Sequence, residues 1–278
     1  MFAGGASFGA VQVGQLRALA RTDIRPDMVV GTSVGSLNAT IVAENPELAA
    51  DRLAAFWSKI RREDVFGSHL DTARRVMSGQ ANAVDPTALR NFIETAIEAR
   101  TFEDLAIPHT AVTCDFDTGE VVPISEGDLV SAVMASAAIP AVFPPVERDG
   151  RRLVDGGLVA NVPISVAAAQ GAQTLVILDC GFTLVASEKN ATMFSNIARM
   201  AAIMAAQQVR NDLEKVTDRT VLYLPGPWPI TSRPDDFARS TDLSASAYEL
   251  TMEWLADLKV SGTGRYGSAP SDSLAKKV

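Results

Sequence analysis

Histidine and cysteine are scarce in this sequence. The two histidines, His69 and His109, both lie in the first half of the 278 residues. α/β-Hydrolases place their catalytic histidine late in the chain, after the nucleophile and the acid, so that triad is excluded. The two cysteines, Cys114 and Cys180, each lie beside an apolar run. Their number excludes a disulfide scaffold, and we expect buried free thiols in a reducing compartment.

The chain also lacks long apolar runs and an excess of basic residues. No apolar run reaches the ~20 residues that a membrane-spanning helix needs, and the first residues lack the basic and apolar regions of a signal peptide. We therefore expect a cytoplasmic protein. The formal net charge of −8 argues against a nucleic-acid partner and against electrostatic adhesion to anionic membranes.

Composition and patterning indicate a soluble α/β protein. Hydrophobic residues make up 47% of the chain and charged residues 21%, and short apolar runs alternate with amphipathic segments. This alternation predicts an α/β sandwich around a mostly parallel sheet. The expected strands are 28–30, 109–114, 121–124, 174–178 and 221–224. No repeat or linker divides the chain, so we expect one domain over residues 1–260 and a loose polar tail over 261–278.

Two stretches allow more than one interpretation. Residues 61–84 contain several arginines and little periodicity, which favours ordinary surface structure over the alternative of a lid. The helix expected at 190–208 carries a methionine-rich stripe, for which packing in the core is favoured over contact with acyl chains. The stripe comprises Met193, Ile197, Met200, Ala201 and Met204.

The motif Gly31-Thr32-Ser33-Val34-Gly35 has the G-x-S-x-G pattern. It follows an apolar strand-like run and precedes a helical pattern, and in that context it forms a sharp turn that exposes the serine hydroxyl. The two glycines form the nucleophile elbow and let the helix pack close to the strand. The free N–H groups at the helix start can stabilise negative charge above Ser33. For the motif alone, a helix-capping or turn serine is the alternative.

A second glycine-rich turn, Gly-Gly-Ala-Ser-Phe-Gly at residues 4–9, precedes a helix expected at 10–20. Such a turn directs several backbone N–H groups toward one point, which suits a phosphate or a transition-state oxyanion. The dinucleotide fingerprint G-x-G-x-x-G is absent. A strand-to-helix turn without a ligand is the alternative.

Ser33 requires a base, because a serine hydroxyl is a weak nucleophile until its proton is removed. We expect His109 to be structural and His69 to be solvated. A partly desolvated carboxylate can serve directly, and the candidates at strand ends are Asp115, Asp155 and Asp179. Gly156 and Gly157 allow close backbone approach and so support Asp155. On residue chemistry alone, Asp155 is favoured as the base to the same degree as Asp115 and Asp179 combined.

Together these motifs resemble the patatin-like phospholipases. The glycine turn at 4–9, the serine motif at 31–35 and the triplet Asp155-Gly156-Gly157 occur in the order and context of that family. Supporting segments are Val13-Gly14 with Leu16, Ser136-Ala137-Ala138-Ile139-Pro140 with Phe143-Pro144-Pro145, and Asn161-Val162-Pro163. The resemblance covers about residues 1–180.

The resemblance implies a lipid acyl hydrolase on a three-layer α/β/α fold, with a serine–aspartate dyad and no metal or organic cofactor. Ser33 would attack the ester carbonyl, and Asp155 would accept its proton before an acyl-enzyme is hydrolysed. The substrate would be a lipid or another acyl ester, reached through transient contact with a membrane surface. The oxyanion hole would be formed by the backbone N–H groups of Gly4, Gly5, Ala6 and Ser7.

The sequence departs from the family pattern in the first few residues. Ala6 and Phe8 stand where the family usually has a glycine and a basic residue. A positive φ at Ala6 would cost about 1 kcal/mol, and Phe8 should make the mouth of the site more apolar and favour simple esters. Only three residues precede Gly4, so we expect a truncated first strand.

These departures motivate an alternative from another class, a catalytically weak protein that binds acyl ligands or a protein partner. A third hypothesis is a nucleotide-binding module that uses the turn at residues 4–9. The sequence leaves the oligomeric state open.

Overall fold

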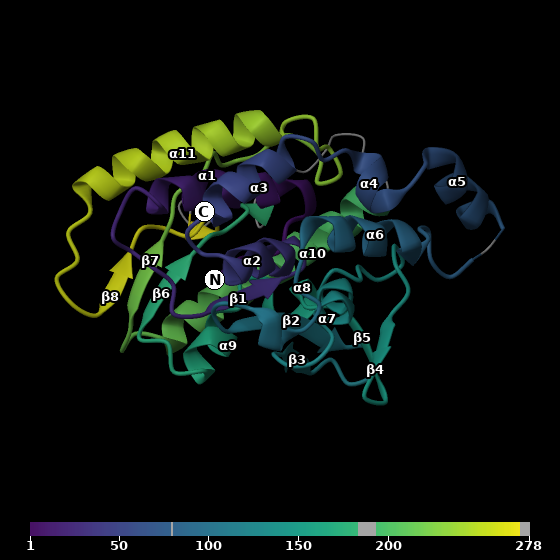
Figure 1. Ribbon diagram of the computed structural model, residues 1–278, viewed down its shortest axis with the longest axis horizontal. Helices are drawn as coiled ribbons and strands as arrows, with labels where there is room; N and C mark the ends of the chain where they lie inside the picture. Colours follow the sequence, from purple (N-terminus) through teal and green to yellow (C-terminus); the bar gives the residue numbers. More distant parts are fainter. Residues whose placement is uncertain (79, 183–192, 273–278) are drawn as a thin grey trace.

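The computed structural model describes residues 1–78, 80–182 and 193–272 (Figure 1). The strands are β1 (Val29–Thr32), β2 (His109–Asp115), β3 (Val121–Ile124), β4 (Val146–Arg148), β5 (Arg151–Asp155), β6 (Thr174–Ile177), β7 (Thr220–Tyr223) and β8 (Gly264–Tyr266). The α-helices are α1 (Gly9–Leu19), α2 (Val34–Glu44), α3 (Ala49–Trp57), α4 (Arg62–Phe66), α5 (His69–Met77), α6 (Pro86–Ala96), α7 (Leu129–Ser136), α8 (Gly157–Ala160), α9 (Ile164–Ala169), α10 (Met193–Lys215) and α11 (Ser240–Asp257). Short 3₁₀ turns lie at η1 (Ala6–Phe8) and η2 (Phe102–Asp104).

A mostly parallel sheet forms the centre of the fold. β6, β7 and β8 pair in parallel, and so do β1 and β2. Phe2 lies between the two groups and forms parallel bridges to Gly31 of β1 and to Leu178 just after β6. At the position of the expected first strand, the chain therefore forms two bridges rather than a regular strand. β3, β4 and β5 extend the sheet by antiparallel pairing.

Two apolar cores cover the two faces of the sheet. Val29 and Ala111 pack with residues of α1, α2 and α7, whereas the next residues, Val30 and Val112, pack with residues of α8, α9 and α10. This alternation follows from the two-residue period of a strand. Figure 1 shows α1, α3 and α11 together on one side of the sheet and α9 on the other. The structure confirms the predicted three-layer α/β/α fold class.

β2 brings together two strand ends that are far apart in the sequence. β1 pairs with the first half of β2, where Thr32 lies opposite Val112, and β5 pairs with the second half, where Asp155 lies opposite Thr113. β3 pairs with part of both halves. Because a strand has only two edges, β1 and β5 must share the edge that β3 leaves free. β5 runs antiparallel to β2, so the last residues of β1 and β5 meet head-on.

Two segments of the chain are more ordered than the sequence pattern indicates. Residues 61–84 include the helices α4 and α5. β8 pairs with β7, and Ala269 and Ser271 are buried. The expected loose tail is thus packed over part of its length, and residues 273–278 lie outside the described chain. A three-residue strand that begins with a glycine and is followed by another gives no periodic signal that could have predicted it.

The methionine stripe of α10 does not pack in the core as expected. Met200 is 63% exposed and Met204 is half-exposed, whereas the small side chains of Ala202 and Ala205 are buried. Small side chains let α10 approach the sheet closely, and the longer ones lie outward. The expected start of the helix at residue 190 lies outside the described residues, as do the side chains of Met193 and Ile197.

Gly14 allows α1 and α11 to cross at short distance. A Cβ atom at this position would lie 2.1 Å from the Ser244 carbonyl oxygen and 2.7 Å from the Tyr248 nitrogen. Both atoms belong to the backbone of α11, which cannot move aside as a flexible side chain would.

We expect the substitution Gly14→Ala to lower the free energy of unfolding by about 1–2 kcal/mol. The 2.1 Å approach to a backbone oxygen places the overpacking cost in the upper part of its usual range, at about 2–3 kcal/mol, which exceeds the ~1 kcal/mol that alanine gains over glycine inside a helix. Equilibrium unfolding in urea measures the difference. A more stable Gly14→Ala variant would contradict the close crossing of α1 and α11.

Candidate active site

Ser33 lies on a strained turn between β1 and α2. Its backbone angles are φ 57° and ψ −130°, a conformation that costs a non-glycine residue about 1–3 kcal/mol. A Cβ at Gly31 would lie 2.4 Å from the Gly35 carbonyl oxygen, and a Cβ at Gly35 would lie 2.4 Å from the Phe2 carbonyl oxygen. The chain is therefore too crowded for side chains at either glycine, which explains why the G-x-S-x-G pattern suits this turn.

Ser136 holds the turn in place, a role that the sequence reasoning did not assign. Its hydroxyl donates to the Val112 carbonyl oxygen at 2.7 Å and accepts the backbone N–H of Ser33 at 2.9 Å. Ser136 is fully buried at the end of α7. It thus links β2 to the backbone of Ser33. The sequence signals for Ser136 were its place in a supporting segment of the family resemblance and a hydroxyl at the end of a small-residue helix.

Asp155 lies in direct contact with Ser33. The Ser33 hydroxyl donates to Asp155 Oδ2 at 2.6 Å, and the Gly157 N–H donates to Asp155 Oδ1 at 2.7 Å. A Cβ at Gly156 would lie 2.3 Å from the Val112 carbonyl oxygen, so this glycine lets the chain turn against β2. Ser33 is 7% exposed and Asp155 is 6% exposed. The structure brings both predicted side chains together in a nearly dry environment.

Burial raises the pKa of Asp155 to about 6. Desolvation of the carboxylate is the largest cause, and the hydrogen bonds from Ser33 and Gly157 oppose it because they favour the charged form. At pH 7 the group is mostly ionised, yet its pKa is closer to neutral pH than that of an exposed aspartate. A carboxylate in this state is a better proton acceptor than an ordinary one.

The glycine turn at residues 4–9 packs against Ser33. A Cβ at Gly4 would lie 3.2 Å from Ser33 Cβ and 2.7 Å from Asn161 Oδ1. Asn161 fixes this end of the turn, because its side-chain Nδ2 donates to the Gly4 carbonyl oxygen at 3.3 Å and its own carbonyl oxygen accepts the Gly4 N–H at 3.0 Å. In the sequence, Asn161 belongs to a supporting segment of the family resemblance, and no local pattern indicates this contact with Gly4.

The four amides expected to bind an oxyanion differ in their availability. The Gly4 N–H is engaged by Asn161, and the Ser7 N–H donates to the Pro234 carbonyl oxygen at 2.9 Å. Within the described chain, the N–H groups of Gly5 and Ala6 have no hydrogen-bond acceptor. Ala6 has φ 49°, the left-handed conformation considered from the sequence. Two of the four donors are therefore free to bind a ligand.

Phe8 lies away from the mouth of the site, and the expectation that it makes the mouth more apolar is wrong. Its side chain is fully buried in the core beneath α1 and α2. Phe8 is the last residue of the 3₁₀ turn η1, and its ring belongs to the apolar core. The apolar character of the mouth comes from other residues.

The other two candidate aspartates have different partners. Asp179 is fully buried and accepts hydrogen bonds from the Tyr223 hydroxyl and the Gly181 N–H. Asp115 accepts the N–H groups of Asp117 and Thr118 in the hairpin between β2 and β3. Of the three candidates, Asp155 is the one hydrogen-bonded to Ser33.

His109 is buried between β1 and α2 and has a structural role, as expected. Its Nδ1 lies 3.4 Å from the Val29 carbonyl oxygen, and its Nε2 lies 3.5 Å from Ser36 Oγ. Burial lowers the pKa of His109 to about 4, so the ring is neutral at physiological pH. His69 begins α5, and its side chain lies outside the described part of the structure.

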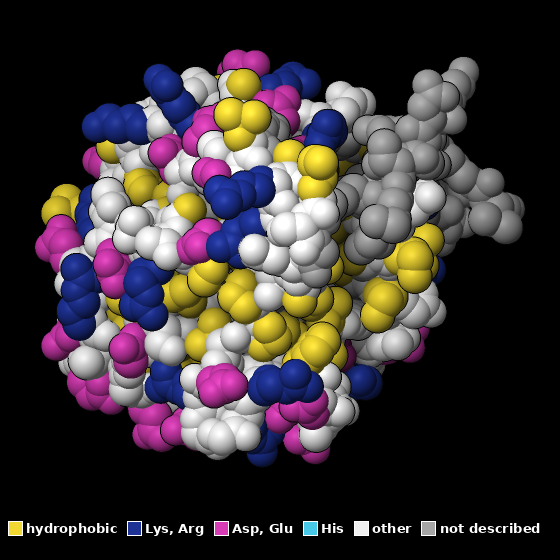
Figure 2. Space-filling model, turned by 90° about the vertical axis from the view of Figure 1, so that its right-hand side faces the viewer, with side chains coloured by type: hydrophobic (Ala, Val, Ile, Leu, Met, Phe, Trp, Pro, Cys, Tyr) yellow, Lys and Arg dark blue, Asp and Glu magenta, His cyan; other side chains and the backbone are white. Residues whose placement is uncertain are grey.

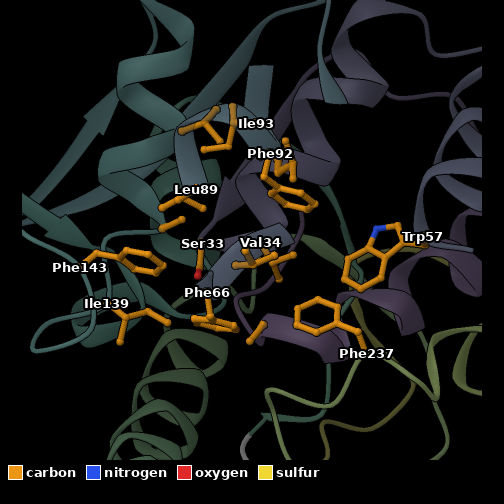
Figure 3. A pocket seen from close by; sticks show the side chains of 15 residues that line it. Ser33, Val34, Trp57, Phe66, Leu89, Phe92, Ile93, Ile139, Phe143 and Phe237 are labelled. Carbon is orange, nitrogen blue, oxygen red and sulfur yellow. The ribbon is translucent and has the colours of Figure 1, made fainter. Parts of the chain in front are cut away.

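A narrow apolar pocket opens above Ser33; its cavity volume is about 50 Å³, and it is partly open to solvent. Figure 3 shows the Ser33 hydroxyl surrounded by Leu89, Phe143, Ile139 and Phe66. The walls come from α2, α3, α4, α6 and α7 together with Ile139, Phe143 and Phe237. Ser33 supplies the one hydroxyl among the fifteen lining side chains. Such a pocket suits an apolar ligand group placed next to the Ser33 hydroxyl.

A metal site is not evident in the described parts of the chain. Across residues 1–78, 80–182 and 193–272, no group of three or more histidine, cysteine, aspartate or glutamate side chains is placed to hold a metal ion. Cys114 and Cys180 are buried free thiols. In the same ranges, no helix combines the length and the apolar character needed to cross a membrane.

We expect Asp155→Asn to stabilise the protein at pH 7.5 by about 1–3 kcal/mol. The folded-state pKa of about 6 lies above the ~3.9 of an unfolded aspartate, so the ionised carboxylate destabilises the folded state above pH 6. As the pH falls from 6 to 4, the folded protein takes up the proton first and this penalty disappears. Asparagine keeps the shape without the charge.

Urea unfolding of both proteins at pH 7.5 and pH 4 measures the effect. The advantage of the variant should be present at pH 7.5 and absent at pH 4. Titration of His109 is common to both proteins and cancels in the comparison. Equal stabilities at pH 7.5 would contradict the raised pKa.

Comparisons with known proteins identify the family of this chain. The sequence pattern of the family described as "Patatin-like phospholipase" matches residues 1–168. The chain is 30% identical over 180 residues to patatin-like phospholipase domain-containing protein 7 of Mus musculus, which covers 64% of this chain and 13% of that protein. It is 34% identical over 184 residues to patatin-like phospholipase domain-containing protein ZK370.4 of Caenorhabditis elegans, with the same coverage.

Two further matches are more distant. Lysophospholipase NTE1 of Mycosarcoma maydis is 29% identical over 190 residues, covering 64% of this chain and 9% of that protein. The crystal structure of VipD from Legionella pneumophila aligns with a TM-score of 0.42 and 13% identity, covering 90% of this chain and 65% of that one. The chain thus matches only a small part of each curated relative. Because the family pattern spans more than half of the sequence, the chain belongs to the patatin-like phospholipase family.

Proposed function

We propose that this protein hydrolyses carboxylic esters of lipids, with Ser33 as the nucleophile and Asp155 as its base. The observation that carries the proposal is the 2.6 Å hydrogen bond from Ser33 Oγ to Asp155 Oδ2 at the floor of an apolar pocket. Membership of the patatin-like phospholipase family and the name of the related lysophospholipase support a lipid substrate.

In the first half of the reaction, Ser33 Oγ attacks the ester carbonyl carbon while its proton passes to Asp155. The carbonyl oxygen becomes an oxyanion in a tetrahedral intermediate. The C–O bond to the alcohol then breaks, and the leaving alkoxide takes the proton from Asp155. The products of this half-reaction are a free alcohol and an acyl group esterified to Ser33.

In the second half, water attacks the acyl carbon and loses a proton to Asp155. Collapse of the second tetrahedral intermediate breaks the bond to Ser33 Oγ, which recovers the proton. A fatty acid leaves, and the dyad returns to its starting state. Asp155 alternates between base and acid, and a pKa of about 6 suits both roles near neutral pH.

The N–H groups of Gly5 and Ala6 are the proposed oxyanion donors. They lack acceptors in the described chain, and the neighbouring Gly4 packs against Ser33. Ser33 also precedes the first residue of α2, so the positive end of that helix faces the same region. One oxyanion-hole donor typically contributes about 2.7–4 kcal/mol in the transition state.

We expect a fluorophosphonate probe to form a covalent adduct with the wild-type protein at Ser33. Ser33→Ala should abolish the adduct, because it removes the nucleophile. Asp155→Asn should slow its formation by about 10²–10⁴-fold, the usual contribution of a general base. Intact-protein mass spectrometry with peptide mapping measures the labelling.

The matched control for this experiment is Ser36→Ala, which removes a buried hydroxyl one turn further along α2. This variant should label as the wild type does. Labelling that persists in Ser33→Ala, or that maps to another residue, would overturn the assignment of the nucleophile.

We also propose that α5 forms the contact with the lipid surface. Leu70 is 83% exposed and Met77 is 88% exposed, and a spacing of seven residues puts both on one face of the helix. Arg74 lies between them on this face without an ion-pair partner among the described residues. The adjoining side of α5 is tied to the body by the Arg75–Asp85 ion pair at 2.5 Å.

The position of α5 supports this role. Gly67 and Ser68 join it to α4, whose residues Val65 and Phe66 line the pocket above Ser33. Figure 1 shows α5 projecting from the body beyond α4 and α6. Figure 2 views the molecule from that side and shows apolar atoms exposed across the centre of the face, with basic side chains above and below them. Insertion of Leu70 and Met77 would bring the pocket mouth to the headgroups and Arg74 to a lipid phosphate.

We expect the double variant Leu70→Ser/Met77→Ser to partition about tenfold or more less strongly onto phosphatidylcholine vesicles, because two apolar side chains are lost from the contact. Vesicle co-flotation measures the partition coefficient. Zwitterionic lipid is the right surface, since the net charge of −8 opposes adhesion to anionic vesicles.

The control is Met200→Ser/Ile203→Ser, which removes two exposed apolar side chains from α10. It should bind vesicles as the wild type does. An equal fall of the partition coefficient in the two double variants, or no vesicle binding by the wild type, would overturn the assignment of α5.

A further inference from the structure

A buried chain of hydrogen bonds runs from α3 to the glycine turn. The Trp57 indole Nε1–H donates to Asn38 Oδ1 at 2.9 Å, and Asn38 Nδ2 donates to Gln12 Oε1 at 2.8 Å. Gln12 Nε2 donates in turn to the Ala3 carbonyl oxygen at 2.8 Å and to the Leu178 carbonyl oxygen at 3.0 Å. Gln12 and Asn38 are fully buried, and Trp57 is almost so.

The direction of this chain is fixed at both ends. An indole N–H can only donate and a backbone carbonyl can only accept. The oxygen of Asn38 must therefore face Trp57, and the amino group of Gln12 must face Ala3 and Leu178. Both side-chain amides are held in a single orientation, because either one turned over would leave buried polar atoms unpaired.

The acceptors of the chain lie at the two ends of the glycine turn. Ala3, whose carbonyl Gln12 holds, comes directly before Gly4. Asn38 Nδ2 also lies 3.2 Å from the carbonyl oxygen of Gly9, the last residue of the turn. Gln12 and Asn38 thus fix the start and the end of a loop whose central amides, those of Gly5 and Ala6, have no acceptor among the described residues. Their contacts are to the backbone, so they can set its position.

Trp57 connects this chain to the pocket. Its ring lines the apolar pocket above Ser33 and stacks on Phe237, with ring centroids 6.1 Å apart. On its other side the ring packs against the turn, where a Cβ at Gly9 would lie only 2.7 Å from Trp57 Cζ2. Figure 3 shows the indole across the pocket from Phe143, at the far end from Ser33. One side chain therefore contacts the space for an acyl chain, the turn and the hydrogen-bond chain.

We propose that Gln12, Asn38 and Trp57 are positioning residues that hold the Gly5 and Ala6 amides in place relative to Ser33. An acyl group in contact with Trp57 improves the position of these amides. This role rests on the proposed ester hydrolysis and predicts selectivity for the length of the acyl chain. Esters whose acyl chains reach Trp57 are turned over faster, so chain length changes kcat as well as KM. The variants below separate this effect from simple binding in the pocket.

The main test uses Trp57→Phe, which keeps an aromatic ring in the pocket but removes the Nε1–H and leaves Asn38 Oδ1 without its donor. With p-nitrophenyl octanoate we expect kcat to fall about tenfold, a fraction of the 10²–10³-fold loss that follows removal of an oxyanion donor. KM should stay within about twofold, because ground-state binding is kept. With p-nitrophenyl acetate, which is too short to reach Trp57, kcat should fall by a clearly smaller factor, because only the positioning by the hydrogen bonds is lost and no acyl contact with Trp57 exists to lose.

A second readout does not depend on activity. Hydrogen exchange of the peptide spanning residues 1–10 reports the hydrogen-bonded amides of Gly4, Ser7 and Phe8. We expect these amides to exchange about tenfold faster or more in Gln12→Leu and to an intermediate extent in Trp57→Phe, because local opening of the turn becomes easier. Ile124→Val changes a core residue of β3, away from these hydrogen bonds, and should alter neither the exchange of this peptide nor kcat.

The outcomes are distinguishable. Unchanged hydrogen exchange in the folded variants, or a rise in KM without a fall in kcat, overturns the positioning role. An equal loss of kcat for acetate and octanoate overturns the coupling to acyl length. If the wild type shows neither turnover nor labelling at Ser33, the proposed function fails. The exchange measurement alone then decides whether the hydrogen bonds from Trp57 through Asn38 and Gln12 hold the turn.

Discussion

The site depends on the pairing of β1 and β5 with the same edge of β2. Thr32 and Asp155 lie opposite consecutive residues of β2, Val112 and Thr113, so the two strands end against each other. A carboxylate and a hydroxyl 122 positions apart are thus brought together by the backbone pairing of two strands with β2. Shifting β5 by one residue would turn Asp155 to the other face of the sheet and separate it from Ser33.

Burial has two opposite effects at this site. It destabilises the folded protein, because Asp155 is ionised in a nearly dry environment. The strained backbone of Ser33 is a separate cost. The same burial makes Asp155 a stronger base than an exposed aspartate. Hydrogen bonds from the surrounding elements offset part of the cost: Ser136 holds the Ser33 backbone, and Gly157 donates to Asp155. The turn at residues 4–9 is held in the same manner by Asn161, Gln12 and Asn38.

The pocket shows how segments with weak sequence signals acquire a role. α4 lies in a stretch that reads as ordinary surface, yet Val65 and Phe66 cover Ser33. Phe237 precedes α11 and reaches the pocket from the far end of the chain, where it stacks on Trp57. Phe8, which the sequence placed at the mouth, is instead directed into the core by η1. Side-chain direction in short turns depends on one or two dihedral angles, and no periodic pattern encodes them.

The sequence by itself determined the alternation of strands and helices, the serine turn, the glycine-rich turn and the family, because these depend on local spacing and on residues with special backbone freedom. It reduced the base to three aspartates but could not choose among them by chemistry, since each follows a strand. Only the tertiary structure decided that Asp155 meets Ser33, that Asp179 meets Tyr223, and that the amides of Gly5 and Ala6 find no acceptor in the described parts of the chain. Those outcomes depend on strand register and on long-range hydrogen bonds between residues whose order in the chain carries no record of their distance in space.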